Sequence, residues 1–253
     1  MAKVIAIANQ KGGVGKTTTS INLSASLAKL NQRVLLVDCD SQGNATSGLG
    51  LNRSTITQSV YNVLVDGLNP RQALQMTPYG VTILPASINL AAVEVELSNL
   101  KFRETRLRAA LDSLRNEYDY IIIDCPPALG LLTINAMTAV DAVIIPMQCE
   151  FYAMEGLAQL LKTIEIIKND LNPLLFIEGI VMTMFDGRSK HNKEVVEEVR
   201  ETLGNLVYET IIPRAVKISE ASSFGVPILF YDKYSRSAKS YLNLAKEVIN
   251  RGK

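Results

Sequence analysis

The chain has 253 residues, of which 47% are hydrophobic and 20% are charged, and its formal net charge is +1. This composition is typical of a soluble globular protein that buries a core, and no apolar run approaches the roughly 18–20 residues needed to cross a bilayer. A uniformly basic protein is also excluded, so any nucleic-acid surface must be local: residues 188–253 carry 12 Lys and Arg against 8 Asp and Glu, whereas residues 1–187 carry 14 against 17.

The first predicted element is a buried strand at residues 4–8, and a helix with apolar residues at helical spacing follows at residues 19–30. Between them, residues 10–18 read Gln-Lys-Gly-Gly-Val-Gly-Lys-Thr-Thr. A strand, a glycine-rich loop and a helix in this order are the context that a phosphate-binding loop requires.

Three glycines, Gly12, Gly13 and Gly15, allow this loop to turn tightly, so that successive backbone N–H groups converge on phosphate oxygens. The free N–H groups and the partial positive charge at the start of the following helix also favour an anion. Lys16 adds a full positive charge near the β- and γ-phosphates, and the Thr17 hydroxyl is placed to ligate Mg²⁺. The expected nucleotide-binding residues of the loop are Lys11, Gly12, Gly13, Val14, Gly15, Lys16, Thr17 and Thr18.

Two carboxylates follow the second predicted strand, which is an apolar run at residues 34–37. Asp38 and Asp40 lie two residues apart and are therefore expected on the same side of the chain. They come at the carboxyl end of a strand beside the phosphate loop, where ligands bind in open α/β sheets. One of them can assist at the metal while the other reaches toward the attacking water. Residues 41–48 are small and polar, which predicts a mobile loop near the nucleotide.

Another predicted strand, at residues 120–124, also ends in an acid, Asp124. This is the Walker B pattern, in which the acid orients Mg²⁺, usually through water. The segment before it is harder to interpret. It predicts short helices at residues 60–65 and 88–97, a strand at 81–84 and a basic helix at 103–115.

Strands and helices continue to alternate after Asp124. We expect strands at residues 142–146, 175–184 and 226–230, helices at 151–168, 194–203 and 237–250, and a polar stretch at 185–193. This alternation predicts an α/β fold with one doubly wound, mostly parallel sheet and helices on both faces, forming a single domain over residues 1–253.

The three cysteines, Cys39, Cys125 and Cys149, are far apart and odd in number. They form no CxxC pair that would indicate zinc, and a chain of this size needs no disulfide staples. We therefore expect buried free thiols and a reducing, cytoplasmic location.

The phosphate loop departs from the common pattern at its start. Gln10 stands where a glycine is usual, and a second lysine, Lys11, directly precedes the glycine pair. This variant resembles the deviant Walker A loop of the ParA/MinD class of P-loop ATPases. In that class the early lysine reaches across a dimer interface to the phosphates held by the other subunit, so the resemblance implies a homodimer in the ATP state.

Longer segments extend the resemblance over the whole chain. Residues 40–46 (DSQGNAT), 150–157 (EFYAMEGL) and 212–221 (IPRAVKISEA) are similar to segments of the ParA/Soj partition ATPases. The resemblance implies a P-loop NTPase fold, ATP and Mg²⁺ as cofactors, and slow ATP hydrolysis that a ParB-like centromere-binding protein stimulates. It also implies that the ATP-bound dimer associates with the nucleoid by binding double-stranded DNA without sequence preference.

The same resemblance assigns roles to individual residues. Lys11, Lys16 and Asp40 are the expected catalytic set, with Asp40 positioning the attacking water. The expected metal set is Thr17, Asp38 and Asp124. The resemblance further implies adenine contacts at Met184 and Pro213, and DNA contacts at Arg188 and Lys217.

Three alternatives remain. A MinD-like division-site ATPase would bind membranes through a C-terminal amphipathic helix, but only Arg251 and Lys253 follow the apolar stripe of residues 237–250, so packing on the core is the better interpretation. An iron–sulfur reductase component needs two cysteines in a glycine-rich setting at the dimer axis, which Cys125 and Cys149 lack. A DNA-binding module without hydrolysis is disfavoured by the complete acidic set.

Overall fold

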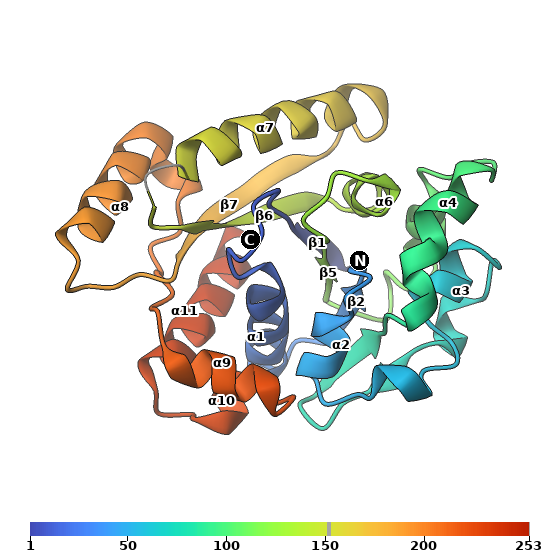
Figure 1. The fold of residues 1–253 in the computed structure, drawn as a ribbon, viewed down its shortest axis with the longest axis horizontal. Coiled ribbons are helices and arrows are strands. Elements are labelled where there is room, and N and C mark those ends of the chain that lie inside the picture. Colours follow the sequence, from blue (N-terminus) through green and yellow to red (C-terminus); the bar gives the residue numbers. More distant parts are fainter. Residues whose placement is uncertain (151–152, 253) are drawn as a thin grey trace.

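A seven-stranded sheet has the strand order β3-β4-β2-β5-β1-β6-β7. Figure 1 shows this sheet running through the molecule between its helices. The computed structural model describes residues 1–150 and 153–252, and within them every neighbouring pair of strands is parallel except β3 and β4. The strands are β1 (Lys3–Ile7), β2 (Val34–Asp38), β3 (Gln75–Met76), β4 (Val81–Leu84), β5 (Tyr120–Asp124), β6 (Ala142–Gln148) and β7 (Phe176–Thr183). The predicted doubly wound, mostly parallel α/β fold is confirmed.

Helices of very different length cover the sheet, from α10 with 4 residues to α7 with 18. They are α1 (Lys16–Lys29), α2 (Asn44–Gly48), α3 (Val60–Leu64), α4 (Val93–Ser98), α5 (Arg106–Asp112), α6 (Leu131–Ala139), α7 (Ala153–Asp170), α8 (Lys190–Leu203), α9 (Val216–Ser223), α10 (Ile228–Tyr231) and α11 (Arg236–Arg251). Short 3₁₀ turns are η1 (Arg53–Thr55), η2 (Pro70–Gln72), η3 (Ile88–Ala92) and η4 (Gly204–Leu206). Phe151, at which the sequence predicts the start of α7, and Lys253 lie outside the described residues.

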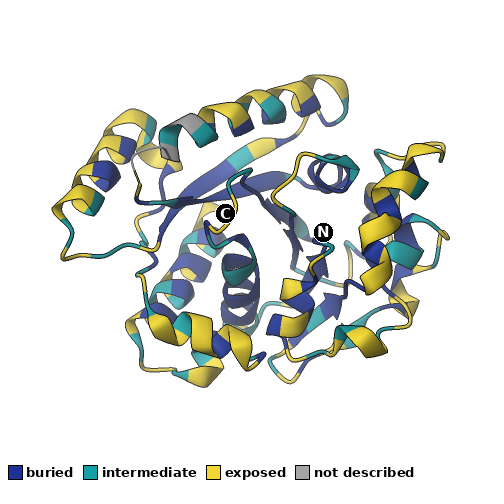
Figure 2. Cartoon of the chain, in the orientation of Figure 1, coloured by how far each residue is buried: buried dark blue, intermediate teal, exposed yellow. Residues whose placement is uncertain are grey.

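The central strands are apolar along their length because helices cover both faces of the sheet. In β1, Val4 and Ala6 belong to one hydrophobic cluster, whereas Ile5 and Ile7 belong to the other, as the alternation of side chains along a strand requires. Helices α3 to α8 supply side chains to the first cluster, and α1, α2 and α9 to α11 supply the second. Figure 2 shows the buried strands between these two layers of helices.

The C-terminal helix α11 uses its apolar stripe inside the fold. Tyr241, Leu244, Ala245 and Val248 are buried in the same cluster as the apolar residues of α1. The interpretation that this stripe packs on the core is therefore confirmed. In the part of the chain that the structure describes, no helix has both the length and the apolarity needed to cross a membrane.

One predicted strand is wrong. The expected strand at residues 226–230 is instead the short helix α10, which starts directly after Pro227 and ends at Tyr231. A short apolar run does not by itself distinguish a strand from a helix. Phe230 is 45% exposed, so the run is not the continuously buried segment that a central strand would be.

Other predicted boundaries shift by a few residues. The loop expected at residues 41–48 ends in α2, which begins after Gly43 in a left-handed conformation with φ 59°. Helix α8 starts at Lys190, inside the stretch expected to be only polar, because the Ser189 side chain caps it by accepting a hydrogen bond from the N–H of Asn192. The sequence reasoning missed α6, α9 and the short strand β3.

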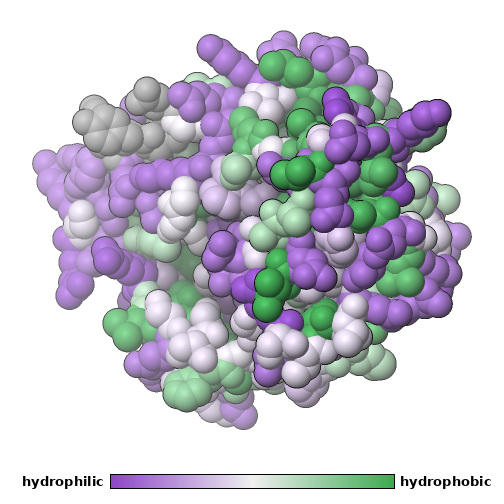
Figure 3. Space-filling model, turned by 45° about the vertical axis from the view of Figure 1, so that its right-hand side comes forward, coloured by the Kyte–Doolittle hydropathy of each residue, from purple (hydrophilic) through white to green (hydrophobic). Residues whose placement is uncertain are grey.

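The face over α3 and α4 carries apolar side chains among polar ones, as Figure 3 shows. Ile88 is 64% exposed, Val95 73% and Leu129 40%. Leu129 belongs to the loop after β5, and α4 packs closely on this loop, because a Cβ atom at Gly130 would lie 1.7 Å from Oε1 of Glu94. This apolar face therefore borders the end of the sheet where the strands have their carboxyl ends and where Asp124 lies.

Candidate nucleotide-binding site

The loop between β1 and α1 has the conformation that its glycines permit. Gly13 and Gly15 have φ angles of 74° and 88°, which side-chain-bearing residues rarely adopt. Helix α1 begins at Lys16, three residues earlier than predicted, so Lys16 and Thr17 lie in its first turn. The N–H groups of that turn have no partner within the helix and can bind an anion.

Side chains from three strand ends hold this loop in place. Asn9 accepts a hydrogen bond from the Lys11 N–H at 3.0 Å and donates one to the Pro146 carbonyl at 2.7 Å. Gln148 donates to the carbonyl of Gly13, and the Thr183 hydroxyl donates to that of Val14. The sequence reasoning missed Asn9 and Gln148, although parallel strands must bring their carboxyl ends to one edge.

Lys16 is almost fully buried, and its ammonium group donates a hydrogen bond to the carbonyl of Lys11 at 3.1 Å. Burial lowers the pKa of Lys16, while nearby Asp124 is the main group that opposes this effect. The cation is thus held within the loop and faces the acids of the neighbouring strands.

Asp124 has a carboxylate oxygen that is available to a metal. Strand pairing places it opposite Asp38, and both side chains are fully buried. Oδ1 of Asp124 accepts a hydrogen bond from the Ser20 hydroxyl at 2.8 Å, but the buried Oδ2 has no partner among the described residues. Burial, and after it the charge of Asp38, raise the pKa of Asp124, whereas the hydrogen bond from Ser20 lowers it.

An unpaired buried carboxylate oxygen beside the Thr17 hydroxyl fits a magnesium ion. The described residues contain no group of three or more His, Cys, Asp or Glu side chains that would hold a metal by themselves. Mg²⁺ is commonly bound by one or two protein groups together with phosphates and water, so this partial ligand set suits it.

Asp38 is engaged differently, because its oxygens already bind the following loop. Oδ1 accepts from the N–H of Asp40 at 3.2 Å, and Oδ2 accepts from the N–H and the hydroxyl of Thr46 at 2.7 and 2.6 Å. The Thr46 hydroxyl in turn accepts from the N–H of Ala86 at 2.9 Å. Asp38 therefore ties the Asp40 loop to the segment after β4.

Asp40 is 7% exposed, and its carboxylate accepts a hydrogen bond from the Gln42 N–H at 2.9 Å. The guanidinium of Arg53 holds the same loop from outside, since it donates to the carbonyls of Ser41 and Gln42. Sequence reasoning did not identify Arg53. The loop that carries Asp40 is thus fixed at both ends rather than freely mobile.

Lys11 lies on the outside of the loop. Its ammonium group forms an ion pair with Glu150 of the same chain at 2.6 Å, and the side chains of Lys11 and Glu150 are 40% and 58% exposed. The structure contains one chain, so the predicted action of Lys11 on a second subunit stays a prediction.

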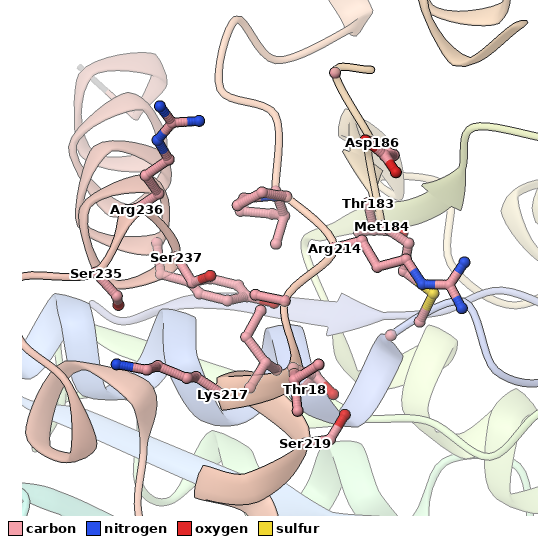
Figure 4. Close-up of a pocket in the computed structure, with 18 of the residues that line it drawn as sticks. Thr18, Thr183, Met184, Asp186, Arg214, Lys217, Ser219, Ser235, Arg236 and Ser237 are labelled. Atoms are coloured by element: carbon pink, nitrogen blue, oxygen red, sulfur yellow. The ribbon is translucent and has the colours of Figure 1, made fainter. Parts of the chain in front are cut away.

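A cavity of about 1100 Å³ extends from the phosphate loop to the basic part of the chain (Figure 4). Thr18 lines it beside the loop, and Met184 and Pro213 line its wall. Met184 has a positive φ of 54°, and backbone pairing of Phe185 with Pro213 joins these two segments. Arg188 and Lys217 line the same cavity. The structure thus brings together residues that the sequence assigned separately to adenine and to DNA.

Comparisons with known proteins identify the family of the chain. The AAA domain family matches residues 2–177. The sporulation initiation inhibitor protein Soj of Bacillus subtilis is 54% identical over 253 residues, which are 100% of both chains. The chromosome partitioning protein ParA of Myxococcus xanthus is 52% identical over 252 residues, covering 99% of this chain and 89% of the relative.

A solved structure has the same fold and a nucleotide. The cobyrinic acid a,c-diamide synthase from Mycobacterium smegmatis with bound ADP and magnesium has a TM-score of 0.88 and 38% sequence identity, covering 100% of this chain and 96% of that one. The name of this structure differs from those of the sequence relatives, which are more similar to the chain and match it over nearly its whole length. The chain belongs to the ParA/Soj family of chromosome-partitioning proteins.

Proposed function

We propose that this protein is a DNA-partitioning ATPase in which residues 1–253 act as one domain. ATP binding closes two copies into a dimer that binds DNA, and hydrolysis releases it, which segregates a chromosome or plasmid. The observation that carries the proposal is the juxtaposition of the glycine loop, buried Lys16 and the unpaired oxygen of Asp124 at one sheet edge. The names of the relatives support partitioning as the purpose.

In this proposal the phosphates of ATP lie on the loop N–H groups and on Lys16, while the base enters the cavity at Met184 and Pro213. Thr17 and Asp124 hold Mg²⁺, and Asp38 supports them from the adjacent strand, through water because its oxygens bind Thr46 and Asp40. Bound Mg²⁺ neutralises charge on the β- and γ-phosphates. The relative solved with ADP and magnesium supports this assignment.

Asp40 orients the water that attacks the γ-phosphate in line with the leaving oxygen. Lys16 and Lys11 neutralise charge that develops in the transition state, and Lys11 does so from the partner subunit. Hydrolysis therefore depends on dimerisation, and turnover is slow until a ParB-like partner stimulates it. The exposed side chains of Ile88, Val95 and Leu129, near the end of the sheet at which Asp124 lies, offer apolar area for the dimer interface.

Arg188 and Lys217 contact DNA phosphates in the dimer, without reading the base sequence. The protein then associates with the nucleoid in the cytoplasm. The positive charge concentrated in residues 188–253 supports this location for the DNA surface.

The test is to measure the molar mass with ATP and Mg²⁺, with ADP, and without nucleotide, each with and without random-sequence duplex. We expect a monomer except with ATP, and DNA binding only by the dimer. A monomer in saturating ATP would overturn the proposed switch. ATP-dependent pelleting with anionic vesicles would instead favour the MinD-like alternative.

A further inference from the structure

Arg188 and Lys217, the two cations proposed to contact DNA, are both paired with carboxylates of their own chain. The Arg188 guanidinium forms a two-point contact with Asp186: Nε donates to Oδ1 at 3.0 Å and Nη2 donates to Oδ2 at 2.9 Å. The Arg188 side chain is otherwise 92% exposed. A two-point contact between a guanidinium and two oxygens is also how arginine binds a phosphate.

The second pair joins two elements. Lys217 of α9 donates to Oδ2 of Asp232, the residue that follows α10. The side chains are 60% and 23% exposed. Hydrogen bonding to Arg188 lowers the pKa of Asp186 to about 2, and Lys217 lowers that of Asp232, so both carboxylates are ionised at neutral pH.

Neighbouring cations on the same cavity differ from these two. Arg214 and Arg236 also line it, yet neither has an ion pair with a described residue. The carboxylates therefore do not pair with every cation on this face. Of the four cations that line the cavity, the two with ion pairs are those at which the family resemblance expects DNA contacts.

We propose that Asp186 and Asp232 compete with DNA phosphates for Arg188 and Lys217. Each carboxylate cancels one positive charge and occupies the position of a phosphate, and DNA binds only by displacing it. Exposed ion pairs are weak, so the displacement is easy at one site. Across the two pairs of each subunit in a dimer the effects multiply, which keeps the protein off DNA until four cations act together.

This inference rests on the proposed DNA-binding function and is tested with Asp186→Asn and Asp232→Asn, singly and together. Asparagine removes the charge but keeps a side-chain oxygen. At position 186 this oxygen can still accept the hydrogen bond that the backbone N–H of Arg188 donates to Asp186 Oδ1 at 3.0 Å. DNA affinity is measured by the anisotropy of a labelled random-sequence duplex, with ATP and Mg²⁺, over a salt series. The Asp40→Ala background prevents hydrolysis during the measurement.

Each substitution is expected to tighten binding by the dimer by about 3- to 10-fold, because one exposed pair is lost in each of the two subunits and both cations are freed. The slope of log affinity against log salt reflects the number of phosphates neutralised, and it is expected to stay the same, because the same cations contact phosphates in the parent once the carboxylates are displaced. A slope steeper by roughly 0.9 for each cation would mean that the parent leaves these cations off the phosphates, and displacement of the carboxylates by DNA would then be refuted.

The matched control is Asp112→Asn, which removes one charge from an ion pair with Arg115 in which the aspartate side chain is 54% exposed. The Arg115 carbonyl accepts from the Ala2 N–H, so this pair lies at the amino end of β1, away from the nucleotide edge. We expect no change in DNA affinity. Equal tightening by Asp112→Asn and Asp186→Asn would overturn the inference, because net charge alone would then explain it.

Arg188→Glu and Lys217→Glu test the proposed DNA surface separately from the proposed competition by carboxylates. If they abolish DNA binding while the asparagine variants bind like the parent, the competition is refuted and the proposed DNA surface stands. If DNA binding survives both glutamates, the surface itself is misplaced, and the competition falls with it.

Discussion

The four cations assigned to ATP or DNA fall into two regions, the interior of the nucleotide site and its exposed rim, which differ in how the cations are held. Lys16 is 7% exposed and bonded to its own loop, close to the buried acids. Lys11, Arg188 and Lys217 lie on the exposed rim, and each is paired with a carboxylate of the same chain. A cation that acts on a ligand held within its own subunit can be fixed in advance. A cation that acts on another molecule must stay accessible, and a weak ion pair keeps it satisfied until then.

The largest effect is expected in the interior region. Lys16→Ala removes the buried cation nearest the phosphate loop, and we expect Mg·ATP affinity to fall by at least about 100-fold, since charge-assisted contacts in a buried site are strong. Isothermal titration calorimetry measures this. Lys29→Ala is the control, because this exposed lysine ends the same helix. Retained affinity in Lys16→Ala would contradict the assignment of the loop.

Asp40→Ala tests catalysis rather than binding. We expect phosphate release to drop by about 100-fold or more, because the attacking water is no longer oriented. Mg·ATP affinity should change little, and the ATP-bound dimer should accumulate on DNA. Full turnover in this variant would assign the catalytic role to a different acid, with Asp38 and Asp124 the nearest candidates.

The interior region was largely predictable from sequence, because its key residues belong to short local motifs. The glycine spacing of residues 12–15 identifies the phosphate loop, and Asp38 and Asp124 follow apolar runs whose ends must meet in a parallel sheet. The supports of that loop were not predictable. Gln148 and Thr183 contact it across 135 and 169 residues of sequence.

The rim was predictable only in part. Resemblance selected Arg188 and Lys217, but no local pattern shows that both line the cavity of Met184 and Pro213. The partner of Lys217 lies 15 residues away, beyond α10. That segment was predicted to be a strand, and residues after a strand would have been placed elsewhere. One incorrect element thus hid one of the two ion pairs.

Thr46→Val tests whether the hydrogen bonds of the Thr46 hydroxyl hold Asp40 in its catalytic position. Valine keeps the volume but loses the hydroxyl that joins Asp38 to the N–H of Ala86. We expect kcat to fall by about 10-fold with little change in KM for ATP, because Asp40 is no longer held in place. The lost buried hydrogen bonds should also lower the free energy of unfolding by about 1–3 kcal/mol.

Steady-state ATPase assays of Thr46→Val measure kcat and KM, and denaturant titration measures the free energy of unfolding. Thr55→Val is the control, because, among the residues that the structure describes, its exposed hydroxyl bonds only the nearby Asn52 carbonyl. A loss of stability without a loss of kcat would mean that Thr46 supports the fold and not the position of Asp40.

The smallest effect is expected from Glu150→Gln, on the rim. The Lys11–Glu150 pair is exposed, so breaking it changes the free energy by less than about 1 kcal/mol. If the pair restrains Lys11 from reaching the partner subunit, freeing it should tighten the ATP-dependent dimer by about 2- to 5-fold. Sedimentation equilibrium in the Asp40→Ala background gives the dissociation constant of the dimer. Glu117→Gln, which opens a similarly exposed pair with Arg71, should leave it unchanged. A weaker dimer in Glu150→Gln would mean that Glu150 helps to place Lys11, and the contrast between a fixed interior cation and a restrained rim cation would then not hold for this lysine.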